Sequence, residues 1–384
     1  MSHATHLAAL QRAIEDAVEP GAIEVDRGGV FPEPAVAALR REGVLGLVSA
    51  PDVGGAGAAL DAAVDVVRRL AQHCASTAMI TCMHYAATVV IEAHGPEPLR
   101  RQIAAGEHLS TLAFSETGSR SHFWAPVGTA SVSGLSGGDS GQVRLDATKS
   151  WVTAASAADS YVWSSRPLHA EGMSSLWLVP ADASGVKVVG AFDGLGLRGN
   201  DSSPVLAEGV VIPADHLLAG DGSGFEVMMG VVLPWFCLMN AGFSVGLMEA
   251  TTAATAQHVS GVRLEHVGDR LADLPTIRAY VARMRIATDQ AAALVADAVD
   301  AVLTDRDDAQ LRVLEAKAAT AEAATEVTGT AMRVCGGAAF GKGLGIERRF
   351  RDARAATVMA PTTDVLYDFI GKAVCGLPLF ETQE

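Results

Sequence analysis

The chain has 384 residues, 49% hydrophobic and 19% charged, with a formal net charge of −15 at pH 7. This composition excludes a disordered protein. The acidic balance argues against general binding to nucleic acid or anionic membranes, which requires a basic surface. The five cysteines form no CxxC pair, so we expect reduced, mostly buried thiols, no metal site and a cytoplasmic location. We expect neither a signal segment nor a membrane-spanning helix.

Residues 1–112 are predicted to form an N-terminal helical domain. An apolar stripe over 7–18 predicts a first helix that ends at Pro20-Gly21. Further helices are expected over 36–42, over 59–73 and up to Gly95-Pro96, with a loop over 51–57. His84 lies in the last of these helices. It either faces a substrate cavity or, as is usual for a helix histidine, is satisfied by packing or water.

Residues 113–220 are predicted to form a small β domain. Helical periodicity stops here, and Gly/Ser clusters such as 133–141 separate short runs rich in β-branched and aromatic residues, over 142–147, 161–164, 176–179 and 205–212. One of these strands continues into Lys149-Ser150-Trp151-Val152-Thr153. Strand alternation predicts that Trp151 and Thr153 point to the same face.

Residues 221–384 are predicted to form a C-terminal helical bundle. Helical patterns over 227–260, 274–303 and 309–334 are each long enough for antiparallel packing, and 305–308 is a plausible turn. The glycines at 341, 343 and 345 are too closely spaced for a Rossmann fingerprint. The order of elements is therefore helices, strands, helices, which indicates an α+β protein.

The C-terminal segment resembles the active-site segment of the acyl-CoA dehydrogenase superfamily. Arg351-Asp352-Ala353 is followed by Ala360-Pro361-Thr362, where the family has a Glu-Gly-Thr triplet. The resemblance implies an N-terminal α-helical domain, a central β-barrel-like domain, a C-terminal four-helix bundle and a homotetramer. The family's glutamate removes the α-proton of the substrate, and Ala360 occupies its position. Ala360 keeps the backbone N–H, which in the family helps to bind the thioester oxygen.

The same resemblance implies that the chain binds FAD. The loop from Phe114 to His122 is similar to the family's flavin loop, and the strand segment ending at Thr153 is similar to its K-x-W-I-T strand. An indole supplies a flat apolar wall, and a hydroxyl can donate to a flavin nitrogen. Arg120 and Val267 depart from the family pattern. The candidate cofactor-binding residues are Ser115, Ser121, Trp151, Thr153, Arg263, Arg333, Gly336, Gly337, Thr362 and Asp364.

Three interpretations of the missing base stay open. The first is a dehydrogenase of CoA-bound or carrier-bound acyl thioesters, with electrons passing to an electron-acceptor flavoprotein or to oxygen. Its base is relocated or supplied by a partner, and Asp364 and Glu249 are the nearest candidates. Phe236 marks an alternative glutamate position of the family and offers no carboxylate. The second interpretation is a flavin monooxygenase on the same fold, and the third is a non-catalytic subunit of a mixed assembly.

Overall fold

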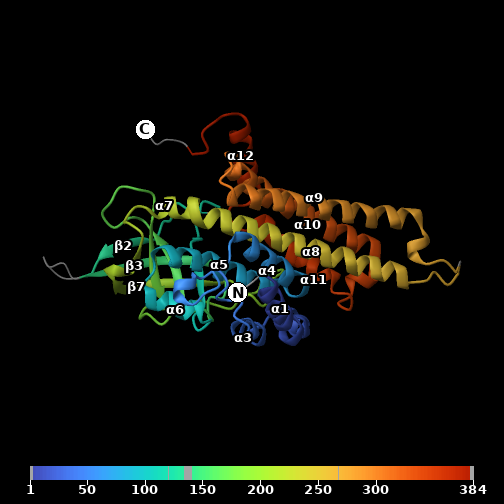
Figure 1. Ribbon diagram of the computed structural model, residues 1–384, viewed down its shortest axis with the longest axis horizontal. Helices are drawn as coiled ribbons and strands as arrows, with labels where there is room; N and C mark the ends of the chain where they lie inside the picture. The colour runs from blue at the N-terminus through green and yellow to red at the C-terminus, as the bar shows by residue number, and fades with distance from the viewer. Residues whose placement is uncertain (1–2, 120, 134–140, 267, 381–384) are drawn as a thin grey trace. The chain divides into compact units, whose positions relative to one another are not determined.

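The computed structural model describes residues 3–119, 121–133, 141–266 and 268–380. Arg120, Val267 and most of the Gly/Ser cluster over 133–141 lie outside the described residues. Residues 1–63, 79–193 and 198–236 form one compact unit, and residues 64–78, 194–197 and 237–384 form a second. Along the chain, helices give way to strands and then to helices again (Figure 1), so the expected order is confirmed. The domain boundaries at 112 and 220 stay a prediction.

The N-terminal region is helical, as expected. Its helices are α1 (His3–Ala13), α2 (Glu19–Gly28), α3 (Glu33–Arg41), α4 (Leu60–His73), α5 (Ala75–His94) and α6 (Glu97–Ala104). The predicted helix end at Pro20-Gly21 is wrong. A π-helical turn over Ile14–Val18 leads directly into α2, and Pro20 stands in the first turn of α2, where no backbone N–H is needed. The helix ends instead at Gly29, in the left-handed region with φ 61°.

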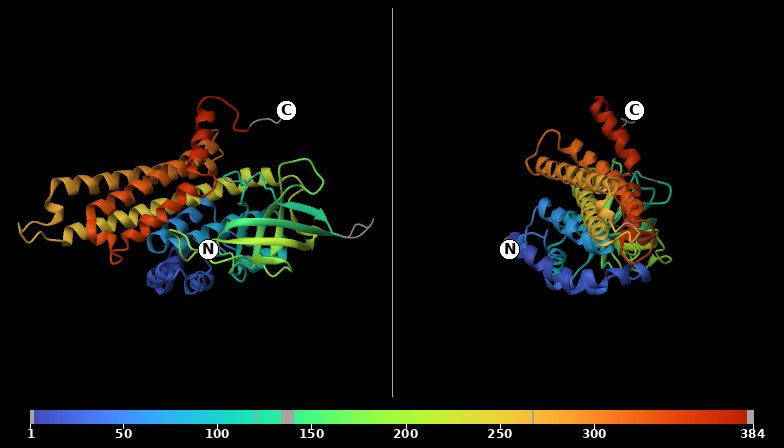
Figure 2. Two further views of the ribbon diagram at one scale, coloured as in Figure 1. Left: turned by 180° about the vertical axis from the view of Figure 1, so that it is seen from behind. Right: turned by 90° about the vertical axis from the view of Figure 1, so that its right-hand side faces the viewer.

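The central region forms two four-stranded sheets, which belong to the first unit and are seen from behind in Figure 2. Their strands are β1 (Ser110–Ala113), β2 (Thr129–Val132), β3 (Gln142–Val152), β4 (Ser160–Ser165), β5 (Ser175–Pro180), β6 (Val186–Val188), β7 (Ser203–Pro213) and β8 (Leu217–Leu218). The strand orders are β1-β4-β5-β8 and β2-β3-β7-β6. All four runs predicted from the sequence fall inside strands. Trp163, Trp177, Tyr161 and Leu145 are buried in one apolar cluster with the alternate residues of β3 and β7.

The second unit contains the long helices of the C-terminal region. Figures 1 and 2 show α8, α9, α10 and α11 side by side, as a bundle requires. The helices of this region are α7 (Gly224–Val227), α8 (Leu233–Gly261), α9 (Pro275–Leu303), α10 (Ala309–Phe340), α11 (Ile346–Val358) and α12 (Thr363–Val374). Helix α10 runs six residues beyond its predicted end at 334, through Gly336 at φ 52° and ψ −131°. Only glycine adopts that conformation without strain, so the chain kinks there and then resumes its helical path.

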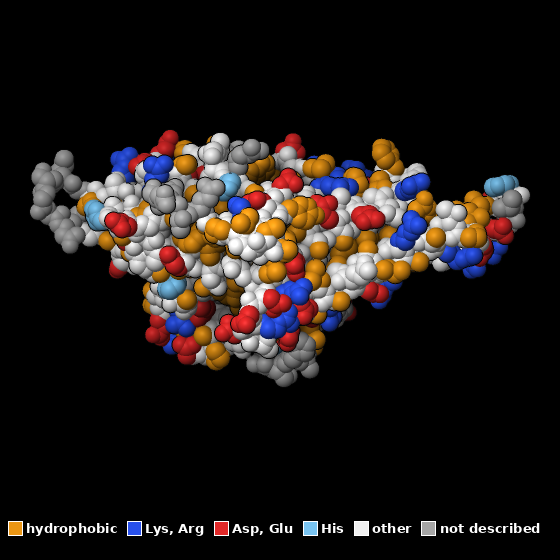
Figure 3. Space-filling view, turned by 90° about the horizontal axis from the view of Figure 1, so that it is seen from above, with side chains coloured by type: hydrophobic (Ala, Val, Ile, Leu, Met, Phe, Trp, Pro, Cys, Tyr) orange, Lys and Arg blue, Asp and Glu red, His pale blue; other side chains and the backbone are white. Residues whose placement is uncertain are grey.

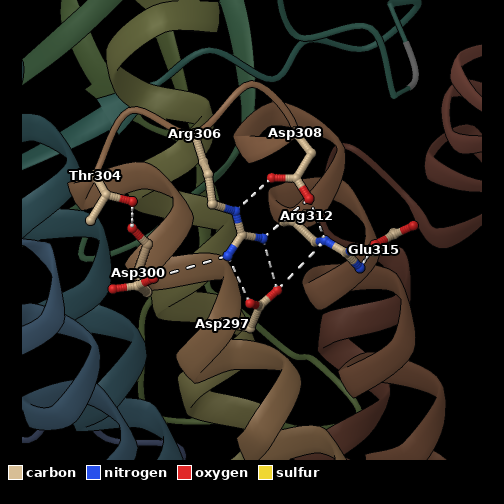
Figure 4. Close-up of polar contacts among 7 residues, drawn as sticks. All are labelled: Asp297, Asp300, Thr304, Arg306, Asp308, Arg312 and Glu315. Carbon is tan, nitrogen blue, oxygen red and sulfur yellow. Dashed lines mark hydrogen bonds and ion pairs between the residues drawn. The ribbon is translucent and has the colours of Figure 1, made fainter.

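Charged side chains fix the turn between α9 and α10 (Figure 4). Arg306 donates to Asp297 at 2.9 Å and to Asp308 at 2.8 Å, and Arg312 donates to Asp308 at 2.9 Å and to Glu315 at 3.0 Å. These planar guanidinium groups share their carboxylate partners, so the network is ordered at a lower entropic cost than separate pairs. The turn predicted over 305–308 is confirmed.

One helical stretch, residues 224–261, is long and apolar enough to cross a membrane by its length and composition. One such helix does not contradict the expectation that no helix of the chain spans a membrane. Residues 227–248 carry no charge, a run that the sequence analysis overlooked. In the structure 83% of its most apolar window is buried, which is the usual environment of a core helix in a water-soluble protein. On the face drawn in Figure 3, acidic and basic side chains lie interspersed.

Candidate active site

The structure places the Ser115 loop directly against the end of β3. The Ser150 N–H donates to the Ser115 carbonyl oxygen at 2.8 Å, and the backbones of Glu116 and Lys149 pair in an isolated antiparallel β-bridge. The buried Glu116 carboxylate accepts hydrogen bonds from the Val127 N–H at 2.6 Å and the Gly128 N–H at 2.9 Å. Two motifs that lie more than thirty residues apart in sequence are thus joined.

Lys149 is the centre of this junction, and the sequence analysis gave it no role. Its ammonium group donates to Glu116 Oε1 at 2.5 Å, to the Ser164 carbonyl at 2.7 Å and to Ser164 Oγ at 2.8 Å. It also lies 5.1 Å from the centre of the Trp163 ring. Burial lowers the pKa of Lys149 to about 8, and the neighbouring Glu116 carboxylate opposes that shift. The pair locks the loop to the sheet.

Trp151 and Thr153 differ sharply in exposure, and their common face stays a prediction. Trp151 is 69% exposed and Thr153 is 1% exposed, with its hydroxyl 3.2 Å from Ser202 Oγ. The pairing of β3 with β7 shifts register between Lys149 and Val152, and Trp151 has a left-handed φ of 59°. This irregularity turns the indole out of the sheet, where Phe192 meets it edge-on at 6.5 Å between ring centres. The result is an open, flat apolar surface beside a buried hydroxyl.

The remaining cofactor candidates of the first unit and those on α10 differ in exposure. Ser121 is buried, Ser115 is partly buried, and Gly336, Gly337 and Arg333 are exposed. A Cβ built on either glycine would meet nothing within 4 Å, so a ligand can approach this backbone closely. The Arg333 guanidinium lies 5.1 Å from the centre of the Tyr280 ring on α9. Arg263 is exposed in the segment after α8, and its backbone pairs with that of Arg270 in an isolated antiparallel β-bridge.

The segment that follows α11 carries the position of the missing base. Met359 follows the last residue of α11, and the Ala360–Pro361 peptide is cis. Thr362 precedes α12, and Asp364 is exposed in the first turn of α12. Among the described residues no acceptor is recorded for the Ala360 N–H. Binding of the thioester oxygen by this N–H, which the resemblance implies, stays a prediction.

A lysine that the sequence analysis missed lies beneath this segment. Lys317 on α10 is fully buried, and its ammonium group donates to the carbonyl oxygens of Pro361 at 2.7 Å, Met359 at 3.0 Å and Ala356 at 3.3 Å. Burial lowers the pKa of Lys317 to about 8 and raises that of Cys237 on α8 to about 12. A lone lysine in an alanine-rich helix gives no sequence signal that separates it from a surface lysine.

The Arg351-Asp352 pair anchors the loop at 195–197. The Asp352 carboxylate accepts a hydrogen bond from the Leu197 N–H at 2.7 Å, and Arg351 donates to the Leu195 carbonyl at 3.2 Å and to Glu347 at 2.8 Å. A side chain at Gly196 would come within 2.6 Å of the Arg351 carbonyl carbon, so only glycine fits there. The motif thus holds a loop of the same unit in place.

The structure disfavours two of the alternative catalytic groups. Both oxygens of Glu249 accept from Arg68 Nη1, at 2.8 and 2.9 Å, and one also accepts from Gln72 at 2.7 Å. His84 is fully buried, with Nδ1 3.2 Å from the Ser110 N–H nitrogen and Nε2 3.2 Å from the Leu45 carbonyl. Burial lowers its pKa to about 4. His84 is thus a neutral structural group, and Glu249 holds α4 to α8.

The glycine pair and the point where α10 contacts the Ala360 segment lie at different positions along α10. Lys317 marks the contact of α10 with the Ala360 segment, and Gly336 follows nineteen residues later. At 1.5 Å per residue this places the two about 28 Å apart along the helix axis. One chain alone therefore does not bring these candidates together.

Comparisons with known proteins agree with the fold and the motifs. Models of the acyl-CoA dehydrogenase N-terminal domain and C-terminal domain match residues 2–106 and 222–375. The chain is 27% identical over 355 residues to the human mitochondrial short-chain specific acyl-CoA dehydrogenase, covering 90% of this chain and 83% of that protein.

Solved structures are similar over nearly the whole chain. The structure of butyryl-CoA dehydrogenase from Megasphaera elsdenii has a TM-score of 0.88 at 20% identity and covers 97% of this chain and 98% of its own. The FAD complex of PigA has a TM-score of 0.87 at 16% identity and covers 97% of each chain. At these identities the structural likeness concerns the fold, and it confirms the predicted architecture of helical N- and C-terminal regions around a central β region.

Proposed function

Because the chain belongs to the acyl-CoA dehydrogenase superfamily, we propose that it is an FAD-dependent oxidoreductase that desaturates an acyl thioester between its α and β carbons. The reaction removes a proton from the α-carbon and a hydride from the β-carbon, and a carbon–carbon double bond forms between them. The substrate is a CoA-bound or carrier-bound acyl group. The electrons pass on to an electron-acceptor flavoprotein or to oxygen, in a cytoplasmic homotetramer.

The outward-turned indole of Trp151 is the observation that carries this proposal. A large aromatic side chain that is 69% exposed and held at a left-handed φ loses the burial energy it would gain inside the sheet. A planar ligand stacked on it recovers that energy. When bound, FAD supplies the acceptor for the hydride. Thr153 and Ser115 would hold its ring, and the open backbone at Gly336 and Gly337 would hold its phosphate or adenine portion.

In this proposal Ala360 and Asp364 each take one of the two roles that the family's glutamate combines, which are binding of the thioester oxygen and removal of the α-proton. We assign binding of the thioester oxygen to the Ala360 N–H, which has no recorded acceptor among the described residues. A donor there stabilises the negative charge that builds on the oxygen as the α-proton leaves. Asp364 is our candidate for the group that takes the proton. It carries an exposed carboxylate four residues further on, whereas the Glu249 carboxylate is held by Arg68.

An anaerobic titration of the purified protein with a panel of acyl-CoA thioesters tests the proposal. Bleaching of the flavin absorbance is the expected result, and it should be lost in Asp364→Asn if Asp364 is the base. Asp368→Asn on the same helix is a matched control, since it also removes one carboxylate. Full bleaching in Asp364→Asn removes Asp364 from the mechanism but leaves the dehydrogenase assignment intact.

Because residue 360 carries no carboxylate, the titration also tests two alternative functions, a flavin monooxygenase and a non-catalytic subunit. A protein that binds flavin, does not bleach and consumes oxygen with a reductant favours a flavin monooxygenase on this fold. A purified protein that cannot be loaded with flavin favours a non-catalytic subunit of a mixed assembly. The same titration therefore separates all three functions.

A further inference from the structure

We propose that Lys317 is a positioning residue that aims and polarises the Ala360 N–H toward the thioester oxygen of the substrate. This inference rests on the proposed function, in which that N–H binds the thioester. It adds a buried residue from another helix to the site, with a role distinct from those of the base and the cofactor-binding residues.

The contacts of Lys317 surround Ala360 on both sides. Its ammonium group donates to the Met359 carbonyl at 3.0 Å and the Pro361 carbonyl at 2.7 Å, the residues immediately before and after Ala360. A third bond, to the Ala356 carbonyl at 3.3 Å, ties the same nitrogen to the last turn of α11. A positive charge at a helix C-terminus also interacts favourably with the helix dipole. The backbone at 359–361 is thus fixed from beneath by one charged group.

The geometry of the peptide bond means that the hydrogen bond from Lys317 to the Met359 carbonyl also fixes the direction of the Ala360 N–H. The Met359 C=O and the Ala360 N–H belong to the same peptide group, which is trans, since the cis bond recorded in this segment follows Ala360. In a trans peptide the C=O and N–H point in opposite directions. Because Lys317 holds the C=O on one side, the N–H must point away from Lys317 on the other side. A hydrogen bond to the C=O also polarises the peptide group and makes its N–H a stronger donor.

The Met359 side chain is held as well. Asn240 on α8 is fully buried, and its Nδ2 lies 3.7 Å from the Met359 sulfur. With its carbonyl held by α10 and its side chain contacted by α8, Met359 has little freedom to rotate the peptide group that carries the Ala360 N–H. Both contacts come from within the second unit, so the aim of the N–H is set by the bundle itself.

Substitution of Lys317 tests this role through the polarisation of the bound thioester. The Met-Ala dipeptide occurs once in the chain, so labelling methionine carbonyl carbons and alanine nitrogens isolates the Ala360 amide in an NMR spectrum. The probes are butyryl-CoA, isotope-labelled at its thioester carbonyl for infrared spectroscopy, and the thioether analogue that lacks the carbonyl. Lys317→Met removes the ammonium at similar volume. Lys372→Met on α12, a partly exposed lysine paired with Asp368, is the control.

In the wild type we expect the thioester carbonyl stretch to fall on binding, the Ala360 amide resonance to move, and the thioester to bind more tightly than the thioether. In Lys317→Met we expect the carbonyl shift to disappear and the thioester preference to fall about tenfold, as loss of one well-made hydrogen bond predicts. Lys372→Met should match the wild type. Lys317→Gln leaves no buried charge and keeps an amide donor, so it should recover part of the effect even where the methionine variant does not fold.

The two possible failures give different results. A folded Lys317 variant with the carbonyl shift, Ala360 resonance and thioester preference of the wild type would overturn the role of Lys317 alone. A wild-type protein that binds the thioester and the thioether equally, with no carbonyl shift, would overturn both that role and the binding of the thioester by Ala360.

Discussion

Replacement of Lys149 by methionine should destabilise the β region far more than the same replacement at Lys187. Lys149 and Glu116 form a buried ion pair whose side chains are 0% and 1% exposed. Lys187 and Glu208 form an exposed pair in the same region, with exposures of 61% and 60%. The two substitutions therefore remove the same ammonium group from two environments that differ in access to water.

The expected size of the effect follows from what each carboxylate retains. In Lys149→Met the Glu116 carboxylate stays buried and keeps its two backbone N–H donors, from Val127 and Gly128, but loses the ammonium group of Lys149. Breaking a buried pair on one side costs about 3–5 kcal/mol, and the two remaining donors place this case at about 3 kcal/mol. In Lys187→Met water solvates Glu208, and a cost below about 1 kcal/mol is expected.

Chemical unfolding followed by tryptophan fluorescence measures this difference. The Lys149 ammonium lies 5.1 Å from the centre of the Trp163 ring, so the probe reports the affected region directly. The double variant Lys149→Met/Glu116→Gln should recover much of the lost stability, because it removes the stranded charge. Equal losses of stability for Lys149→Met and Lys187→Met would refute the reasoning, and so would a double variant no more stable than Lys149→Met.

Three further predictions address other residues. Trp151→Ala should weaken FAD binding by about tenfold or more, as measured by titrating the apoprotein with FAD. The unfolding midpoint of this variant should stay near that of the wild type, because the indole is 69% exposed. An unchanged FAD affinity would argue against stacking of the flavin on Trp151. Burial lowers the pKa of His84 in the folded protein to about 4, from 6.5 in the unfolded chain. The unfolded chain therefore binds an extra proton between those values, and stability falls as pH falls through that range. By pH 5 this proton uptake lowers the free energy of unfolding by about 2 kcal/mol relative to pH 7. In His84→Asn the free energy of unfolding should therefore fall less between pH 7 and pH 5. An unchanged dependence on pH would contradict the buried, neutral state of His84. Asp364→Asn should abolish substrate-dependent bleaching and leave FAD affinity unchanged, and a joint loss of both would instead mark Asp364 as a cofactor contact.

Much of the architecture was predictable because its periodic patterns are long and uninterrupted. The helices over 274–303 and 59–73 and the strands over 161–164 and 176–179 follow from apolar spacing and turn residues alone. The error at Pro20-Gly21 has a physical cause. A π-helical turn placed the proline in a first turn, where its missing N–H costs nothing. Single-sequence patterns do not reveal such local changes of helix type.

The candidate site was predictable only where a motif carried it. The loop at Ser115 and the segment at Ala360 were located by resemblance, and the structure shows the former hydrogen-bonded to β3. Lys317 was missed because its importance depends on carbonyl oxygens that lie about forty residues further along the chain and approach it only in the folded bundle. The exposure of Trp151 was missed because a register shift is invisible in an alternating pattern.

The irregular end of β3 has a consequence for changes in chain length. Between Lys149, which is fully buried, and Trp151, which is open to solvent, stands the single residue Ser150. Deleting or inserting one residue there would shift one flank of β3 by one position, so that either the lysine leaves its ion pair or the indole changes face. Substitutions of the Ser150 side chain leave that spacing unchanged. A library covering 149–153 should therefore tolerate many replacements at Ser150 while losing every member whose length differs by one.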